Sequence, residues 1–394
     1  MAREAKRDVD LPFQLSEYEG RLERVRESAS ARGLEVLLVT SPTNIYYLTG
    51  FDSFSFYSPQ FLVVPLEEGP FMVPRSIDRI SVRDHSWLGE DNIIPYGEEY
   101  VDHYVNYPDP RHPVDFLVHL FRKKGLTSVR LGVELDDYYC RAFYYRRLRE
   151  ELPGVEVQNA TQLVPRLYLR KSDAEIEYMK EASRIVEKGM RTAVDAISEG
   201  VKENEIAAKI LETTVMEGSC TPSIPPFLQT TGACHRTWTE EEITRGTSVS
   251  IEIAGCKRRY QSPMCRTVIV DEGSSPVVTE AREVLSKQID AHRKALETVR
   301  PGIRAERVAE EANRIFSERS SRIGYPAGLG FPPDWGERTA SFQEGDQTVL
   351  EPNMTFHVIS TLTEPFMMEF SETIRVTEDG AEVLAEFPRK LFVR

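Results

Sequence analysis

Residues 246–270 read GTSVSIEIAGCKRRYQSPMCRTVIV, and this stretch indicates how the second half of the chain folds. Its apolar and β-branched residues predict two strands, Val249–Ala254 and Arg266–Val270. One carboxylate, Glu252, stands inside the first strand between two isoleucines. Because successive strand residues point to opposite faces, Glu252 lies either on the solvent face of an edge strand or inside a cleft.

The segments on either side of this stretch predict helices and further strands. Residues 172–175 read Ser-Asp-Ala-Glu, a capping box in which the serine accepts an early amide hydrogen bond and the glutamate reaches back. A long helix with an apolar stripe follows the box. The other expected elements are helices near residues 204–217, 278–299 and 304–317 and strands at Thr355–Ile359 and Thr373–Thr377.

The first part of the chain alternates between strand and helix patterns, which predicts a sheet covered by helices. A turn is expected at residues 41–44, Ser-Pro-Thr-Asn. We therefore expect an α+β protein, with an α/β domain over residues 1–160 and a second domain over residues 161–394. The elements of the first domain are helices near 16–32, 113–122 and 138–151 and strands at Val36–Val39, Phe61–Val64, Phe71–Val73, Arg130–Val133 and Val155–Gln158.

Composition limits the class of protein. At 394 residues the chain exceeds the roughly 250–300 residues that a single core reaches, so two domains are expected. The formal net charge of −14 argues against nucleic-acid and anionic-membrane partners, which need clustered lysine and arginine. The charged N-terminus does not resemble a secretory signal, and no stretch approaches the ~20 apolar residues of a membrane span. Five scattered cysteines without a C-x-x-C pair fit a reducing compartment, so a cytoplasmic protein is expected.

Three segments, in the same order along the chain, resemble the pita-bread hydrolases, which form the creatinase and prolidase superfamily. They are residues 169–176 (LRKSDAEI), residues 246–270, and the end of the chain, where EPNMTF at 351–356 is followed by TEDGAE at 377–382. The resemblance covers almost the whole chain. It implies a creatinase-like N-terminal α/β domain, a C-terminal pita-bread catalytic domain and hydrolase activity.

Metal-dependent members of this superfamily bind two divalent ions with two Asp, one His and two Glu, and the ions activate a water molecule. With Arg266-Thr267 as the shared anchor, the resemblance places these ligands at positions where this chain has Glu252, Pro263, Tyr325, Ile359 and Ser371. Proline and isoleucine side chains have no donor atoms. We therefore expect no metal and no other cofactor.

The resemblance also indicates a catalytic histidine. Creatinase works without metal and relies on a histidine that matches His235, although creatinase has a carboxylate where this chain has Cys265. Histidine is the side chain best suited to proton transfer near neutral pH. The chain is further similar to ectoine hydrolases, in Arg259-Tyr260 and in residues 102–105, 111–113, 251–255 and 330–337.

Carboxylates are the candidate nucleophiles and charge partners. Because Glu252 occupies a ligand position of the superfamily, we expect it to point into the cleft, as nucleophile or as the base that activates water. Glu369 and Glu372 are three residues apart, so in a strand only one of them faces the site. We favour Glu372 as the partner of a cationic nitrogen group, because it adjoins Ser371, and keep Glu369 as the alternative.

Two further residues are candidates for substrate binding. Arg338 suits bidentate recognition of a substrate carboxylate, or it forms a surface ion pair with Glu337 or Asp334. Tyr260 belongs to a segment that is similar to ectoine hydrolases.

These observations favour a metal-independent hydrolase of a C–N bond in a small zwitterion. The reaction would be the ring opening of ectoine to N-acetyl-diaminobutyrate, or else a creatinase-like one. One alternative is a metal-dependent Xaa-Pro dipeptidase or aminopeptidase, against which the missing ligands count. The other is a catalytically dead pita-bread module that binds proteins, against which His235 and its polar neighbours count mildly.

An aromatic cluster, Phe54, Phe56 and Tyr57, is a further candidate for substrate binding and generates a prediction about oligomeric state. The cluster either packs inside the first domain or, as the resemblance to a dimeric family implies, borders the cleft of a partner subunit. We therefore predict a homodimer, and light scattering should give twice the mass of one chain. A monomer at working concentration would contradict this prediction.

Overall fold

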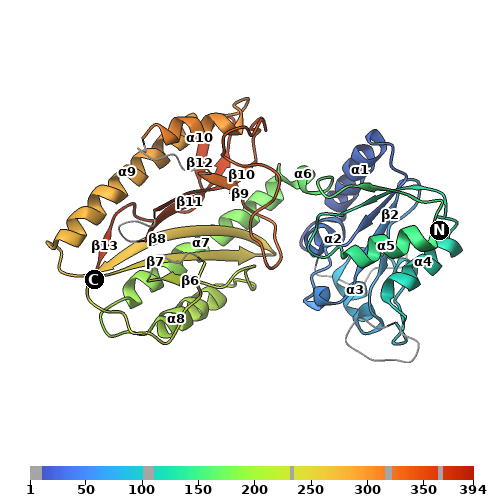
Figure 1. Ribbon diagram of the computed structural model, residues 1–394, viewed down its shortest axis with the longest axis horizontal. Helices are drawn as coiled ribbons and strands as arrows, with labels where there is room; N and C mark the ends of the chain where they lie inside the picture. Colours follow the sequence, from blue (N-terminus) through green and yellow to red (C-terminus); the bar gives the residue numbers. More distant parts are fainter. Residues whose placement is uncertain (1–10, 101–110, 231–234, 316–321, 363–366) are drawn as a thin grey trace. The chain divides into compact units, whose positions relative to one another are not determined.

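Figure 1 shows the computed structural model, which describes residues 11–100, 111–230, 235–315, 322–362 and 367–394. The chain divides into two compact units, Met1–Leu167 and Tyr168–Arg394, each built on one sheet with helices packed against it. The expected fold class, α+β, is confirmed. Among the described residues, no helix is long and apolar enough to cross a membrane.

The first unit contains a five-stranded sheet in the order β3-β2-β1-β4-β5. Strand β1 pairs antiparallel with β2 and parallel with β4. The strands are β1 (Val36–Val39), β2 (Phe61–Pro65), β3 (Phe71–Val73), β4 (Arg130–Val133) and β5 (Glu156–Asn159). The α-helices are α1 (Leu15–Ala31), α2 (Pro42–Thr49), α3 (Arg79–His85), α4 (Pro113–Lys123), α5 (Ala142–Glu151) and α6 (Pro165–Tyr168).

Helix α2 corrects the expectation of a turn at residues 41–44. The helix begins at Pro42, because the fixed φ of proline suits the first helical turn, where its missing N–H costs no hydrogen bond. Gly50, with a φ of 80°, ends it. The buried Glu134 carboxylate accepts hydrogen bonds from the amides of Thr40 and Ser41 at 2.7 and 2.8 Å, and thereby anchors the start of α2 to the end of β4.

The second unit contains an eight-stranded sheet whose main path runs β6-β7-β8-β11-β10-β9. Its strands are β6 (Phe227–Gln229), β7 (Thr247–Lys257), β8 (Tyr260–Val270), β9 (Gly324–Pro326), β10 (Thr355–Leu362), β11 (Met368–Val376), β12 (Ala381–Val383) and β13 (Phe392–Val393). Strands β7 and β8 are longer than expected, because they continue to a tight turn at Arg258 and Arg259, whose φ values are 47° and 67°.

Two helix pairs cover this sheet (Figure 1). Helices α7 (Asp173–Ala196) and α8 (Glu203–Met216) share an apolar core with β7 and β8, whereas α9 (Pro276–Thr298) and α10 (Ala305–Asn313) share one with β10 and β11. The capping box at the start of α7 is confirmed: the Ser172 amide donates to Glu175 Oε2 at 2.7 Å.

The core under α7 decides which way Glu252 points. Ile251 and Ile253 belong to that core, so Glu252 between them faces the side of β7 away from the helices. A Cβ atom on Gly255 would lie 2.0 Å from the Ala182 carbonyl oxygen of α7. Glycine is therefore required for the helix to approach the strand this closely.

Strands β8 and β11 form the seam between the two halves of the sheet. In the part of the chain that the structure describes, their register is a single pair, Cys265 with Ser371. Threonine hydroxyls complete the seam on either side of that pair. Thr267 Oγ1 accepts a hydrogen bond from the Glu369 amide at 3.0 Å, and Thr373 Oγ1 donates to the Pro263 carbonyl at 2.8 Å.

Candidate functional site

Side chains on the face of the sheet away from the helices form three cross-strand rows. Residues that pair directly on neighbouring strands share a face, so the register fixes which side chains meet. The first row is Gln229, Ser250, Thr267, Glu369 and Thr361; the second is Phe227, Glu252, Cys265, Ser371 and Ile359; the third is Ala254, Pro263, Thr373, His357 and Tyr325. The five positions that correspond to metal ligands of the superfamily all lie in the second or third row.

A pocket of about 640 Å³ opens on this face, a volume typical of small-molecule sites. Three residues proposed from the sequence line it together: His235, Glu252 and Arg338. The other lining residues are Ile224, Phe227, Arg322, Tyr325, Pro333, Asp334, Trp335, Gly336, Glu337 and Ala340.

Two carboxylates in the rows, those of Glu252 and Glu369, are buried, with 3% of each residue exposed. Burial and then the charge of Glu369 raise the pKa of Glu252 to about 8, against an opposing hydrogen bond from Cys265. Burial likewise raises the pKa of Glu369 to about 7. A positive charge placed near both carboxylates would lower both pKa values, because it favours their ionised forms.

A chain of hydrogen bonds runs from the pocket wall into the sheet. Trp335 Nε1 can only donate, and it donates to Tyr325 Oη at 3.0 Å; Tyr325 Oη also forms a hydrogen bond with His357 Nδ1 at 2.9 Å. On its other side, the His357 ring forms a hydrogen bond between Nε2 and Ser371 Oγ at 2.6 Å. Burial lowers the pKa of His357 to about 3, so the ring is neutral at physiological pH.

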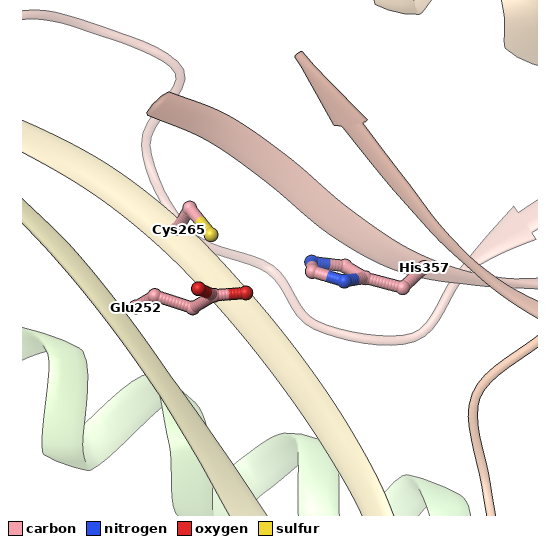
Figure 2. A group of neighbouring side chains, drawn as sticks. All are labelled: Glu252, Cys265 and His357. Atoms are coloured by element: carbon pink, nitrogen blue, oxygen red, sulfur yellow. The ribbon is translucent and has the colours of Figure 1, made fainter. Parts of the chain in front are cut away.

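Figure 2 shows Glu252, Cys265 and His357 pointing toward one another, with one potential ligand atom of each within 4.8 Å of the others. This spacing alone would admit a metal ion. However, both His357 ring nitrogens already have hydroxyl partners, and burial raises the pKa of the Cys265 thiol well above its usual value. The neutral thiol hydrogen-bonds Glu252. The trio therefore fits a hydrogen-bonded cluster better than a metal centre.

The dinuclear metal set of the superfamily does not fit this face either. Pro263 and Ile359 hold two of the five ligand positions and offer no donor atom. Tyr325 stands where the histidine is expected, and burial raises the pKa of its phenol well above the usual value. The hydroxyl of Ser371 already accepts the Cys265 amide at 2.7 Å. Of the five positions, only Glu252 keeps a carboxylate.

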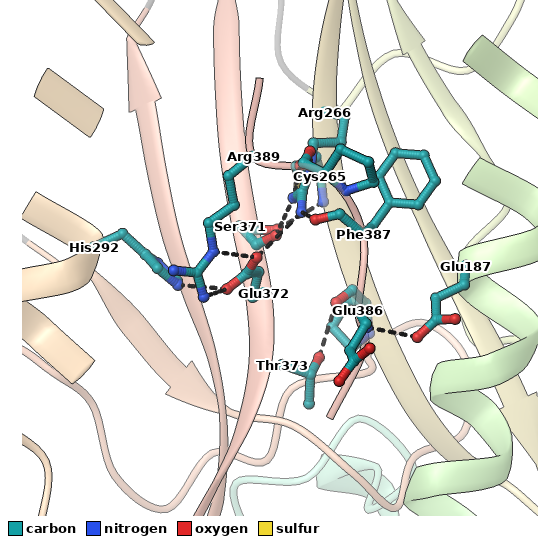
Figure 3. Close-up of polar contacts among 12 residues, drawn as sticks. Glu187, Cys265, Arg266, His292, Ser371, Glu372, Thr373, Glu386, Phe387 and Arg389 are labelled. Carbon is teal, nitrogen blue, oxygen red and sulfur yellow. Dashed lines mark hydrogen bonds and ion pairs between the residues drawn. The ribbon is translucent and has the colours of Figure 1, made fainter. Parts of the chain in front are cut away.

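Glu372 faces away from the pocket, which corrects our preference for it over Glu369. Figure 3 shows its carboxylate in a buried ionic network, 3.2 Å from Arg266 Nη2, 2.9 Å from His292 Nε2 and 2.7 Å from Arg389 Nη2. Burial alone would raise the pKa of Glu372, but the His292 hydrogen bond and the charged partners lower it to about 2. Glu372 is thus a structural anion, and Glu369 is the glutamate of β11 that lies beside Glu252.

His235 reaches the pocket from a loop whose preceding residues, 231–234, lie outside the described part of the chain. Its φ of 60° is uncommon for a residue other than glycine, and such strain is frequent at functional sites. Buried Gln229 holds this loop: its Oε1 accepts the His235 amide at 3.1 Å and its Nε2 donates to Glu369 at 2.7 Å. Gln229 therefore connects the candidate acid–base residue to the carboxylate pair.

Arg338 lies on the pocket wall with 56% of its side chain exposed, and its Nε donates to Asp334 at 3.1 Å. The sequence offered Glu337 and Asp334 as ion-pair partners of Arg338, and in the structure Asp334 is the partner. Glu337 is instead buried against Lys171, whose Nζ lies 2.5 and 2.6 Å from its two carboxylate oxygens. The guanidinium of Arg338 is therefore already placed beside a carboxylate at the pocket.

Tyr260 does not line the pocket. It is fully buried, and its hydroxyl donates to Glu175 at 2.6 Å, so it supports the start of α7 instead of binding substrate. In the first unit, Phe54 and Tyr57 are more than half exposed and so lie outside its core, and Phe56 packs on Phe54 with the ring centroids 4.9 Å apart. Whether the aromatic cluster borders a partner subunit stays a prediction.

Sequence reasoning missed His357, Gln229 and Trp335. A signal existed for His357, because it stands two residues before Ile359 and therefore shares the face of that ligand position. Gln229 and Trp335 depend on loops that bring them to the sheet, and no local pattern marks them.

Comparisons with known proteins agree with this architecture. Residues 177–378 match the model of metallopeptidase family M24, and residues 21–167 match that of the creatinase/prolidase N-terminal domain. An ectoine hydrolase from Halomonas elongata is 37% identical over 406 residues, covering 98% of this chain and 99% of that protein. A creatinase from a Bacillus species is 28% identical, covering 95% and 92%. The solved prolidase from Thermococcus sibiricus has the same fold, with a TM-score of 0.82 at 20% identity over 96% of this chain and 99% of that one.

The side chains at the five ligand positions generate a prediction about metal content. We expect the purified protein to retain no stoichiometric Mn, Co or Zn after dialysis, because these side chains and the Glu252–Cys265–His357 cluster are poor ligands as they stand. Elemental analysis measures this directly. One or two equivalents of a divalent ion that survive dialysis would contradict the prediction.

The raised pKa of Glu252 generates a prediction about stability. In the folded state Glu252 keeps its proton up to a pH of about 8, whereas in the unfolded chain it releases the proton near pH 4.5. The free energy of unfolding therefore falls as pH rises from about 4.5 to about 8. The neutral variant Glu252→Gln should therefore gain thermal stability over the wild type as pH rises from 5.5 to 8.5. The exposed control Glu378→Gln should not. A constant difference across this range would contradict the assignment.

Proposed function

This chain belongs to metallopeptidase family M24, and from that premise we propose that it is a metal-independent hydrolase that opens the ring of ectoine. Its relatives are named as hydrolases, and the chain is a hydrolase of this family. The substrate and the independence from metal are the parts that we propose.

The pair of buried carboxylates, Glu252 and Glu369, is the observation that carries the proposal. Ectoine is a compact zwitterion with a carboxylate and a cyclic amidinium. The amidinium brings a positive charge and N–H donors to a site in which burial and the charge of Glu369 otherwise disfavour the ionised form of Glu252. Its binding lowers the pKa of Glu252 from about 8 and leaves this group ionised at neutral pH. The side chains at the five ligand positions are poor metal ligands, so a metal ion does not provide the positive charge. In the proposed reaction the substrate provides it.

In the proposed reaction, Glu252 attacks the amidinium carbon, or activates a water molecule that does so. That carbon is electrophilic because the amidinium charge is delocalised onto it. His235, which lines the same pocket, donates a proton to the leaving nitrogen. One water is added overall, one ring C–N bond breaks, and the product is N-acetyl-diaminobutyrate.

Arg338 is the proposed partner of the substrate carboxylate. Its planar guanidinium presents paired donors at the pocket and already bonds the carboxylate of Asp334. A zwitterion with its anionic end on Arg338 and its cationic end toward Glu252 and Glu369 would be bound through both charges.

Two other functions are less well supported. A creatine-like guanidinium offers the same positive charge, and the match to a creatinase keeps it as the second substrate class. An Xaa-Pro dipeptide has a neutral, weakly electrophilic peptide bond and gains little from two carboxylates without a metal. A protein-binding module without catalysis would have no use for the strained His235 or for a buried carboxyl group such as Glu252, whose pKa is raised to about 8. We also propose a cytoplasmic homodimer in which the loop Phe51–Tyr57 borders the partner's cleft.

The proposed roles predict the effect of two substitutions. Glu252→Gln and His235→Ala should each lower the turnover of ectoine by at least about a hundredfold, because nucleophilic and acid–base groups typically contribute 10²–10⁴. Chromatography of the ring-opened product measures the rate, and circular dichroism checks the fold. The controls His119→Ala and Glu378→Gln, at exposed positions, should keep the wild-type rate. Near wild-type turnover in both test variants would refute the assigned roles.

A further inference from the structure

Cys220 and Cys256 lie side by side in the second unit and take no part in the reaction proposed above. Their sulfur atoms are 3.1 Å apart, about 1 Å beyond the ~2.05 Å of a disulfide bond. The Cys220 amide donates to the Cys256 carbonyl at 2.9 Å, so a backbone hydrogen bond holds the two residues together. Ser219 Oγ reinforces this contact, because it accepts the Cys256 amide at 3.1 Å.

The pair is connected to the pocket through both chain segments. Cys256 stands four residues after Glu252 in β7 and therefore on the same face of the strand. Cys220 begins residues 220–224, which we call the wall segment, because it ends at Ile224 in the pocket wall. Within it, the Ser223 amide donates to Gln261 Oε1 at 2.8 Å, on strand β8.

We infer that Cys220 and Cys256 are a redox-active pair whose disulfide clamps the wall segment to β7. The two thiols differ in access, since Cys220 is partly exposed and Cys256 is buried. An oxidant from solution, such as glutathione disulfide, therefore meets Cys220 first. The Cys220 thiolate attacks one sulfur of glutathione disulfide, which forms a mixed disulfide and releases one glutathione thiolate.

The second step closes the protein disulfide. The Cys256 thiolate attacks the Cys220 sulfur at the adjacent position, the mixed disulfide breaks, and a second glutathione thiolate leaves. The protein loses two electrons and two protons, and one glutathione disulfide becomes two glutathione thiols. Excess thiol reverses both steps. In the oxidised protein, the disulfide attaches Cys220 to Cys256 on β7, the strand that carries Glu252. Ile224 of the pocket wall is only four residues from Cys220.

Redox titration of the whole protein tests this inference. Protein reduced with dithiothreitol and desalted is equilibrated at increasing ratios of glutathione disulfide to glutathione and then alkylated. We expect two of the five thiols to be lost together and mass spectrometry to find one linked peptide pair, Cys220 with Cys256. The Tm should rise by about 5–10 °C on oxidation and return on reduction.

Variants identify the pair and exclude other cysteines. Cys220→Ser and Cys256→Ser should each abolish the linked peptide and the rise in Tm, whereas Cys140→Ser and Cys234→Ser should keep both. Because Cys220 is partly exposed, its variant decides the test if the Cys256 variant does not fold. A constant thiol count at every ratio, or a lasting glutathione adduct on Cys220 beside an alkylated Cys256, would overturn the inference. These measurements need no substrate, so they are independent of the proposed ectoine reaction.

Discussion

The buried guanidinium of Arg266 holds the two halves of the second sheet together, and the site depends on this interaction. Strands β8 and β11 share one register pair in the described chain, so the seam has little backbone pairing of its own. Arg266 is 1% exposed and donates to the carbonyls of Cys265 and Ser371 at 2.9 and 2.7 Å and to the Glu372 carboxylate. Breaking a buried pair of this kind is costly, because the remaining charge is left without compensation. The register of the seam pairs Cys265 with Ser371. Because Glu252 pairs with Cys265 on the neighbouring strand, this register also places Glu252 in line with Ser371.

The two glutamates of β11 show how one strand serves both structure and chemistry. Glu372 has cationic partners that hold its pKa at about 2, whereas burial raises the pKa of Glu369 to about 7 on the opposite face. The first charge is balanced within the protein, and it ties β11 to α9 and to the end of the chain through His292 and Arg389. The second charge, that of Glu369, lies beside Glu252 and has no cationic partner among the residues that the structure describes. A cation bound there would favour the ionised forms of both carboxylates. A metal-dependent relative can meet that need with ions, and we propose that here the substrate meets it.

The sequence predicted most of the fold because local signals were strong. The capping box at Ser172 and the apolar strands of both units appear where expected, whereas the helix at Pro42 was missed because proline also marks turns. Strand parity was sufficient to choose between the two glutamates: since Ser371 faces the site, its neighbour Glu372 must face away and Glu369 must share its face. Adjacency to a ligand position was the wrong criterion. The contacts of Gln229 and Trp335 arise from loops and tertiary packing, which no local pattern encodes.

We propose that this pocket hydrolyses a cationic ring without a metal ion. The most direct test is to incubate the purified protein with ectoine, with creatine and with Xaa-Pro dipeptides, each with and without a chelator, and to follow the products by chromatography. We expect conversion of ectoine to N-acetyl-diaminobutyrate at the same rate with and without chelator, and no cleavage of the dipeptides. Hydrolysis of dipeptides that the chelator abolishes, with ectoine left intact, would contradict it.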